Sequence, residues 1–173
     1  MNYILRRAVK DDAVDICLVQ QVTWRATYAS EENHITQEEI NKYTSAWTSD
    51  ENIQMFEKII TRRNDWLVAE VEGKVVGHLL IENENNYKII RMLYVLPKYQ
   101  NLGIGRALLN LTCAKNEVAI FVDVVAYNQK AIKFYERNGF KFYRDEPNSA
   151  EPLPSGKTLP LRRLKKPATR QAF

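Results

Sequence analysis

Residues 93–109 read Leu-Tyr-Val-Leu-Pro-Lys-Tyr-Gln-Asn-Leu-Gly-Ile-Gly-Arg-Ala-Leu-Leu, and this stretch carries the clearest chemical signal in the chain. An apolar strand ends at Pro97, a short polar loop follows, and Gly103 and Gly105 stand where a helix begins. Helix N-termini expose unpaired N–H groups and the positive end of the helix dipole, which suit a phosphate. Glycine lets the backbone approach an anion closely, and Arg106 adds a positive charge. The stretch predicts an anion-binding loop or, in the plainer alternative, a glycine-rich helix start without a ligand.

Two common nucleotide-binding motifs do not fit this loop. A P-loop needs a glycine, four residues and then Gly-Lys-Ser/Thr, and nothing here has that order. A dinucleotide-binding loop needs Gly-x-Gly-x-x-Gly, and Leu108 occupies its third glycine position. The spacing Gln100-Asn-Leu-Gly103-Ile-Gly105 instead matches the pattern Gln/Arg-x-x-Gly-x-Gly/Ala.

A second motif follows downstream, where residues 128–140 read Asn-Gln-Lys-Ala-Ile-Lys-Phe-Tyr-Glu-Arg-Asn-Gly-Phe. Together the two segments resemble the GNAT acyl-CoA N-acyltransferase superfamily, whose second signature is Asn-x-x-Ala-x-x-Phe-Tyr-x-x-x-Gly-Phe. The resemblance covers residues 3–143. The Trp24-to-Tyr28 spacing and Leu-Pro-Ser-Gly at 153–156 are similar to small-molecule or polyamine acetyltransferases of this group.

The resemblance implies an α/β (α+β) fold with a mixed, mostly antiparallel, splayed sheet of about six or seven strands and about four or five flanking helices. The strands at 88–96 and 118–125 would separate, with the pantetheine arm of acetyl-CoA in the gap. Backbone groups expected to bind this arm belong to Leu93, Tyr94 and Val95. N–H groups expected to bind the pyrophosphate belong to Gln100, Asn101, Leu102, Gly103, Ile104, Gly105, Arg106 and Ala107. Further cofactor contacts are expected from Asn128, Ala131, Phe134 and Tyr135.

The implied reaction is acetyl transfer to an amine, which needs a neutral amine, a polarised carbonyl and a protonated leaving thiolate. Tyr135 is the expected general acid, because the resemblance points its phenol at the thioester sulfur; packing in the core is the alternative reading of its helix face. Many family members carry a glutamate where Ile89 stands here. Glu82 is therefore a candidate base acting through water, although a solvated turn also explains it.

Trp24 and Tyr28 are candidate residues for the acceptor amine, with Glu31 and Glu32 nearby in sequence to attract a cation. Core aromatic packing explains them equally well. His78 lies in the middle of a predicted strand, which is typical of a histidine in the protein interior. The histidines and cysteines are scattered along the sequence, so no metal site is predicted. The expected acceptor is a polyamine or another small amine. The alternatives are a protein N-terminus or lysine, or a non-catalytic acyl-CoA-binding sensor.

Hydrophobic periodicity gives the order of the elements. Asp11-Asp12, Thr36 and Ser49 are predicted to cap three helices. Further helices are predicted over 103–116 and 128–135, and strands over 3–8, 66–71, 74–81, 88–96, 118–125, 140–143 and 158–164. Residues 1–146 form the predicted acetyltransferase domain. Residues 147–173 are predicted to add a proline-rich loop, a last edge strand and a basic tail to the same domain.

Composition limits the remaining possibilities. The chain has 173 residues, of which 45% are hydrophobic and 27% charged, as expected for one globular domain. No apolar run reaches the length of a membrane span, and the N-terminus does not resemble a secretory signal. With two scattered cysteines, these features favour a cytoplasmic protein with buried thiols. The net charge of +4 arises after Glu151, where six basic residues follow. A solvated strand and tail is favoured over a nucleic-acid-binding arm, and exposed sheet edges would allow a homodimer.

Overall fold

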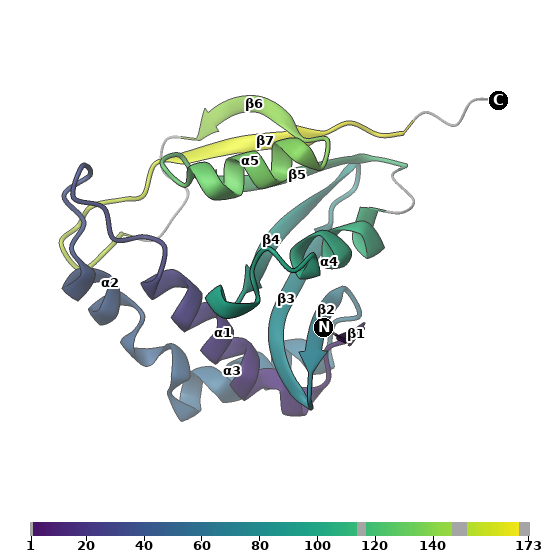
Figure 1. The fold of residues 1–173 in the computed structure, drawn as a ribbon, viewed down its shortest axis with the longest axis horizontal. Helices are drawn as coiled ribbons and strands as arrows, with labels where there is room; N and C mark the ends of the chain where they lie inside the picture. The colour runs from purple at the N-terminus through teal and green to yellow at the C-terminus, as the bar shows by residue number, and fades with distance from the viewer. Residues whose placement is uncertain (1, 114–116, 147–151, 170–173) are drawn as a thin grey trace. The chain divides into compact units, whose positions relative to one another are not determined.

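The computed structural model describes residues 2–113, 117–146 and 152–169 (Figure 1). The strands are β1 (Ile4–Arg7), β2 (Trp66–Val71), β3 (Lys74–Asn83), β4 (Tyr87–Val95), β5 (Ala119–Val125), β6 (Lys141–Glu146) and β7 (Leu161–Lys166). The α-helices are α1 (Ala13–Arg25), α2 (Gln37–Tyr43), α3 (Asp50–Thr61), α4 (Ile104–Cys113) and α5 (Gln129–Arg137). Short 3₁₀ helices are η1 (Lys10–Asp12), η2 (Ser45–Thr48) and η3 (Pro97–Tyr99).

The seven strands form one sheet in the order β1-β2-β3-β4-β5-β7-β6. The pairs β1–β2, β2–β3, β5–β7 and β6–β7 are antiparallel, whereas β4 and β5 run parallel. This mixed, mostly antiparallel sheet with five α-helices confirms the predicted fold class.

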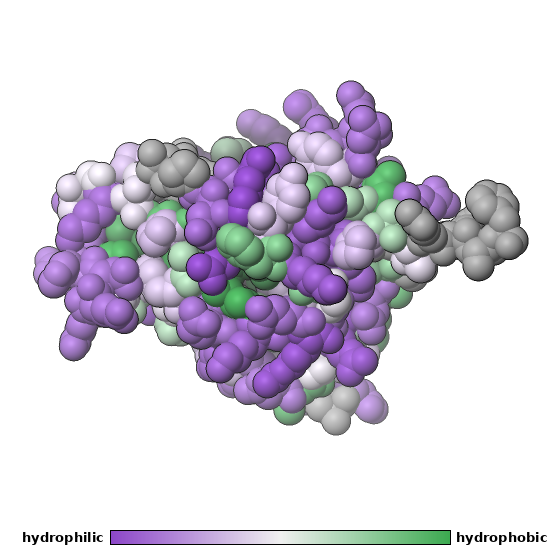
Figure 2. Space-filling view, turned by 90° about the horizontal axis from the view of Figure 1, so that it is seen from above, coloured by the Kyte–Doolittle hydropathy of each residue, from purple (hydrophilic) through white to green (hydrophobic). Residues whose placement is uncertain are grey.

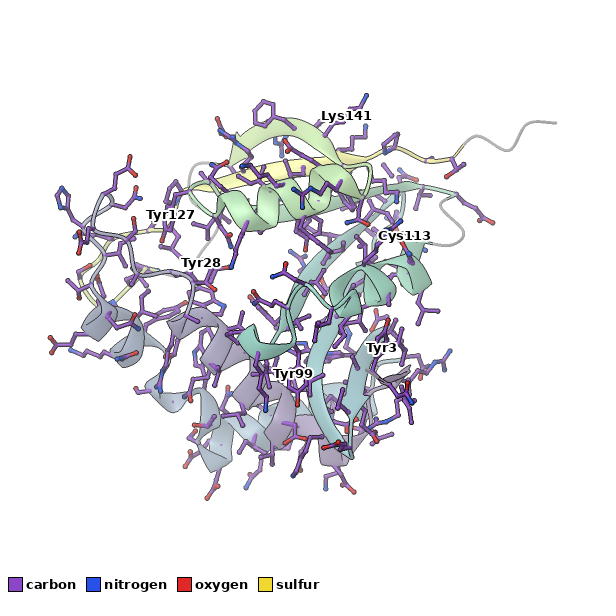
Figure 3. All side chains as sticks on the ribbon, viewed as in Figure 1. Tyr3, Tyr28, Tyr99, Cys113, Tyr127 and Lys141 are labelled. Atoms are coloured by element: carbon purple, nitrogen blue, oxygen red, sulfur yellow. The ribbon has the colours of Figure 1, made fainter. Side chains whose placement is uncertain are left out.

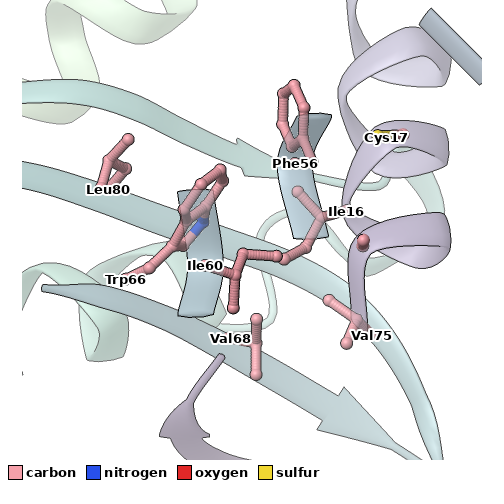
Figure 4. Packing of buried hydrophobic residues seen from close by; sticks show 9 residues of the cluster. Ile16, Cys17, Phe56, Ile60, Trp66, Val68, Val75 and Leu80 are labelled. Carbon is pink, nitrogen blue, oxygen red and sulfur yellow. The ribbon is translucent and has the colours of Figure 1, made fainter. Parts of the chain in front are cut away.

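The chain divides into two compact units, and the first contains Met1–Leu80 and Met92–Leu109. Its core lies where α1 and α3 pack on β2 and β3, because each of these elements turns an apolar face to the others (Figure 4). Trp66 is the largest side chain of this core and packs against Phe56 with ring centroids 5.5 Å apart. Asp15 of α1 also accepts a hydrogen bond from the N–H of Val75 at 3.0 Å, which ties the helix to the sheet.

The second unit contains Ile81–Arg91 and Asn110–Phe173, and α5 runs along its strands (Figure 1). Strand β7 pairs with β5 on one side and with β6 on the other. The prediction of a last edge strand is therefore wrong: β6 is at the edge, and Leu164 of β7 has no exposed surface. The pairing of Phe142 and Arg144 with β7 is interrupted by a bulge, a common protection of edge strands.

Two of the four basic side chains of β7 pair with carboxylates within this unit. Arg163 donates from Nε and from one terminal nitrogen to the two carboxylate oxygens of Asp123, each at 2.7 Å, and its other terminal nitrogen pairs with Glu146 at 3.0 Å. Arg162 pairs with Asp145 at 3.2 Å. The carboxylates of β5 and β6 thus account for these two charges without an acidic partner.

Two of the three helix caps predicted from the sequence are present in the structure. The side chains of Thr36 and Ser49 accept hydrogen bonds from the third residue of α2 and α3, as predicted. Asp12 makes no side-chain cap to α1; its carboxylate instead accepts a hydrogen bond from the N–H of Val9, the N-cap residue of η1, and two from Arg6. Asp12 therefore fastens β1 to the turn before α1.

On the face seen in Figure 2, hydrophilic residues predominate and hydrophobic residues form separate small patches. None of the helices in the described residues has both the length and the apolar character that crossing a membrane requires.

Candidate functional site

The end of β4 belongs to the first unit and leads into the glycine loop. The ladder between β4 and β5 runs from Tyr87↔Ala119 to Ile90↔Val122, and β4 continues to Val95. On the β3 side, the N–H of Leu96 donates to the carbonyl of Val76 at 2.9 Å. Leu93, Tyr94 and Val95, the predicted pantetheine-binding residues, are half-buried.

Gly77 of β3 allows the close approach of this segment. A Cβ atom at Gly77 would lie 3.0 Å from the carbonyl oxygen of Tyr94 and 3.1 Å from a methyl carbon of Val95. Few side chains fit so close to backbone, so glycine is required for this strand spacing.

The glycine loop has the geometry of an anion site. Two residues adopt left-handed backbone angles, Asn101 with φ 62° and Gly103 with φ 84°. The first α-helical hydrogen bond of α4 runs from the N–H of Ala107 to the carbonyl of Gly103 at 2.9 Å. The N–H groups of residues 104–106 therefore lie in the first turn, where an α-helix supplies no carbonyl partner.

The position beside Gly103 is uncrowded among the described residues. A Cβ atom at Gly103 would have no heavy atom within 4 Å. Gln100 holds the loop to the end of β4, because its side-chain amide donates to the carbonyl of Val95 at 3.0 Å. Ile104 is 1% exposed and anchors the helix in the core, whereas Leu102 and Arg106 are exposed. Unpaired N–H groups in the first turn of a helix are the kind of donor that a phosphate group needs.

The second predicted motif lies on α5, in the second unit. The side-chain oxygen of Asn128 caps this helix by accepting a hydrogen bond from the N–H of Ala131 at 3.1 Å. Tyr135 is 5% exposed, and its ring lies 5.2 Å from the rings of both Phe134 and Phe140. Asn128 and Tyr135 therefore also stabilise the fold, as the alternative interpretation of this helix face expected.

The candidate bases differ in their surroundings. A terminal oxygen of Glu82 accepts a hydrogen bond from Arg91 at 2.5 Å, so a guanidinium balances its charge. Ile89 is 4% exposed and supplies no acid or base. His78 has no exposed surface; its Nδ1 accepts a hydrogen bond from the Trp66 indole at 3.2 Å. Burial lowers the pKa of His78 to about 3, and its other nitrogen has no hydrogen-bond partner among the described residues.

Four half-buried aromatic side chains gather in the first unit, at α1, the turn after it, α2 and η2. This aromatic cluster consists of Trp24, Tyr28, Tyr43 and Trp47. The Trp24 ring lies 4.4 Å from Tyr28, 5.5 Å from Tyr43 and 5.0 Å from Trp47, centroid to centroid. Figure 3 shows Tyr28 just beyond the C-terminal end of α1. The structure thus brings the two predicted acceptor residues together.

Sequence reasoning missed Tyr43 and Trp47 as site residues. Tyr43 is the last residue of α2, and Trp47 belongs to a short 3₁₀ helix, so neither stands in a motif. The phenol of Tyr94 also meets this cluster, because it accepts a hydrogen bond from the Trp24 indole at 3.0 Å. Burial raises the pKa of that phenol, and the bond from Trp24 partly offsets the rise.

The cysteines take different positions. Cys17 is buried, and burial raises the pKa of its thiol to about 11, whereas Cys113 is only half-buried. Within the parts of the chain that the structure describes, no three His, Cys, Asp or Glu side chains group as metal ligands.

Comparisons with known proteins agree with the fold. The chain is similar to the PaiA N-acetyltransferase of Thermoplasma acidophilum in complex with coenzyme A, with a TM-score of 0.73, 20% identity and coverage of 96% of this chain and 99% of that one. It is also similar to the ribosomal-protein-S18-alanine N-acetyltransferase of Escherichia coli, with a TM-score of 0.66, 16% identity and coverage of 99% and 97%.

Sequence comparison gives an N-alpha-acetyltransferase of Sulfurisphaera tokodaii, which is 33% identical over 44% of this chain and 56% of that protein. An uncharacterized N-acetyltransferase of Mycobacterium bovis is 31% identical over 43% of this chain and 51% of its own length. The chain thus spans about half the length of the curated relatives that it matches. The model of the acetyltransferase (GNAT) family matches residues 32–140, more than half of the sequence, and the chain belongs to that family.

Proposed function

We propose that this protein transfers an acetyl group from acetyl-CoA to a primary amine. The observation that carries the proposal is the loop after β4, where the first-turn N–H groups of α4 have no helical carbonyl partner and a Cβ atom at Gly103 would meet nothing within 4 Å. A diphosphate is the ligand that this arrangement suits best. Membership of the GNAT family makes coenzyme A the expected bearer of that diphosphate.

Acetyl-CoA would supply an activated acetyl group, and the chain would hold and orient it. Backbone groups of Leu93 and Val95 would bind the pantetheine arm, and residues 100–107 the pyrophosphate. The side chain of Gln100 ties the glycine loop to the carbonyl of Val95, so the sites for the pantetheine arm and for the pyrophosphate are held by one continuous segment. Ala131, Phe134 and Asn128 would add cofactor contacts from α5.

The proposed reaction is direct attack by a neutral amine on the thioester in a ternary complex. Tyr135 would donate its phenolic proton to the departing thiolate. Glu82 would accept the proton of the amine through water, with Arg91 holding the carboxylate in place. His78 does not suit this role, because its Nδ1 lone pair is already occupied by the Trp66 indole.

The proposed acceptor is a polyamine or another small amine. Trp24 and Tyr28 would contact it, and Glu31 and Glu32, which are exposed in the turn after α1, would attract its charge. A protein N-terminus is the second candidate, because one relative is named an N-alpha-acetyltransferase.

Acetyl-CoA-dependent acetylation of competing acceptors tests this choice. Spermidine, putrescine, lysine and short peptides with free N-termini are mixed at equal concentration with the protein and acetyl-CoA. Mass spectrometry is expected to show acetylated di- and polyamines first. Preferential acetylation of the peptides would transfer the proposal to the second candidate.

A further inference from the structure

The aromatic cluster of Trp24, Tyr28, Tyr43 and Trp47 lies where α1, α2 and η2 meet, and all four of its side chains are only half-buried. Its planes are inclined to one another, by 59° for Trp24 and Tyr28 and by 74° for Trp24 and Trp47. Tyr43 and Trp47 also meet at 66° with centroids 5.7 Å apart. Inclined rings at these distances are usual among packed aromatic side chains, and the same inclination allows two or more ring faces to meet one organic cation in aromatic cages.

Hydrogen bonds fix the cluster in place. The Trp24 indole donates to the Tyr94 phenol at 3.0 Å, so the orientation of the central ring is set by β4. The guanidinium of the neighbouring Arg25 donates to the hydroxyl of Thr44 at 2.9 Å, which fixes the end of α1 to the end of α2. A rigid set of rings loses little side-chain entropy on binding a ligand.

Local charge favours a cation at this place. Residues 24–48 carry four carboxylates, Glu31, Glu32, Glu38 and Glu39, against the two positive charges of Arg25 and Lys42. Two negative charges are therefore in excess here, although the whole chain has a net charge of +4.

We propose that the aromatic cluster binds an alkylammonium group that is not the amine to be acetylated. The reacting nitrogen must lose its charge before it attacks, whereas attraction to ring faces requires a charge. The cluster would therefore select acceptors with at least two basic nitrogens, one held as a cation and one reactive. This inference rests on the proposed function for the acceptor, but the cation site itself is testable without catalysis.

The test compares choline with 3,3-dimethylbutan-1-ol, which has the same shape without the charge. Neither compound has a primary amine, so acetylation does not interfere. Titration calorimetry and tryptophan fluorescence are expected to show choline binding about fivefold or more tightly than the neutral alcohol. Equal affinity of the two compounds, or no binding of choline, would overturn the proposal.

Variants of the aromatic cluster test whether choline binds there. Trp47→Leu is expected to weaken choline binding about fivefold, and Trp47→Phe less, because a smaller ring remains. Trp66→Phe is the matched control, since Trp66 contacts Phe56 and His78 instead, and its choline affinity should equal that of the wild type. Circular dichroism establishes that each variant is folded. An unchanged affinity in folded Trp47→Leu contradicts the assignment. Choline binding without acetylation of any amine would leave the cation site standing and refute the proposed function.

Discussion

Replacing Gly103 with alanine separates the binding role of the glycine loop from its structural role. Gly103 has φ 84°, a conformation that costs an alanine about 1 to 2 kcal/mol. A Cβ atom there would touch nothing within 4 Å, so no steric clash adds to that conformational cost. The open space is where we place the pyrophosphate, and the new methyl group would occupy it.

The expected loss of cofactor affinity follows from the contacts displaced. Losing one charge-assisted hydrogen bond from a backbone N–H to a phosphate costs about 1.5 to 3 kcal/mol. That corresponds to about a 10- to 150-fold increase in Kd for acetyl-CoA. Calorimetric titration of acetyl-CoA into the wild type and the variant measures it.

Gly73 provides the matched control. It lies in the turn between β2 and β3, has φ 76°, and a Cβ atom there would also meet nothing within 4 Å. Gly73→Ala should therefore lose as much stability to urea as Gly103→Ala while binding acetyl-CoA normally. Equal acetyl-CoA affinity in the two variants would refute the assignment of the loop.

Three further variants test other parts of the account. Tyr135→Phe should lower kcat by tenfold or more with little change in the Kd of acetyl-CoA, because only the phenolic proton is lost; an unchanged kcat would exclude Tyr135 as the acid. The low pKa of His78, about 3, means that the unfolded chain binds more protons than the folded one between about pH 6.5 and pH 3, so stability falls as the pH drops through this range. In urea titrations, the free energy of unfolding of the wild type should fall between pH 6 and pH 4 by about 2 kcal/mol more than that of His78→Leu. The same decrease in both proteins would contradict this expectation. Asp123→Asn should lower the unfolding free energy by about 1 to 2 kcal/mol, because it weakens the half-buried pair with Arg163, and a neutral effect would show that β7 does not depend on this pair.

Local patterns predicted much of the fold. The strand at Trp66–Val71 agrees with its predicted bounds, because its run of mostly apolar residues ends at the turn-forming Glu72-Gly73. The helix caps at Thr36 and Ser49 were also visible, since capping depends on residues close in sequence. The loop at Gly103 was recognisable because a positive φ at a helix start favours glycine.

Features that depend on distant residues were not predictable in this way. The place of β7 between β5 and β6 depends on pairs such as Arg163 with Asp123, which are 40 residues apart. The hydrogen bond from Trp24 to Tyr94 joins residues 70 positions apart, so the extent of the aromatic cluster could not be read from spacing. Asp12 had a local cap available, but the guanidinium of Arg6 is the stronger partner for a carboxylate.

The most direct test of the central claim is thiol release from acetyl-CoA with and without an amine, followed with a thiol reagent. We expect release of coenzyme A that requires the amine, saturates with it and falls in Gly103→Ala. Calorimetric binding of acetyl-CoA without thiol release for any of spermidine, putrescine, lysine or a peptide would contradict it. That result would instead identify the protein as a non-catalytic sensor of acyl-CoA.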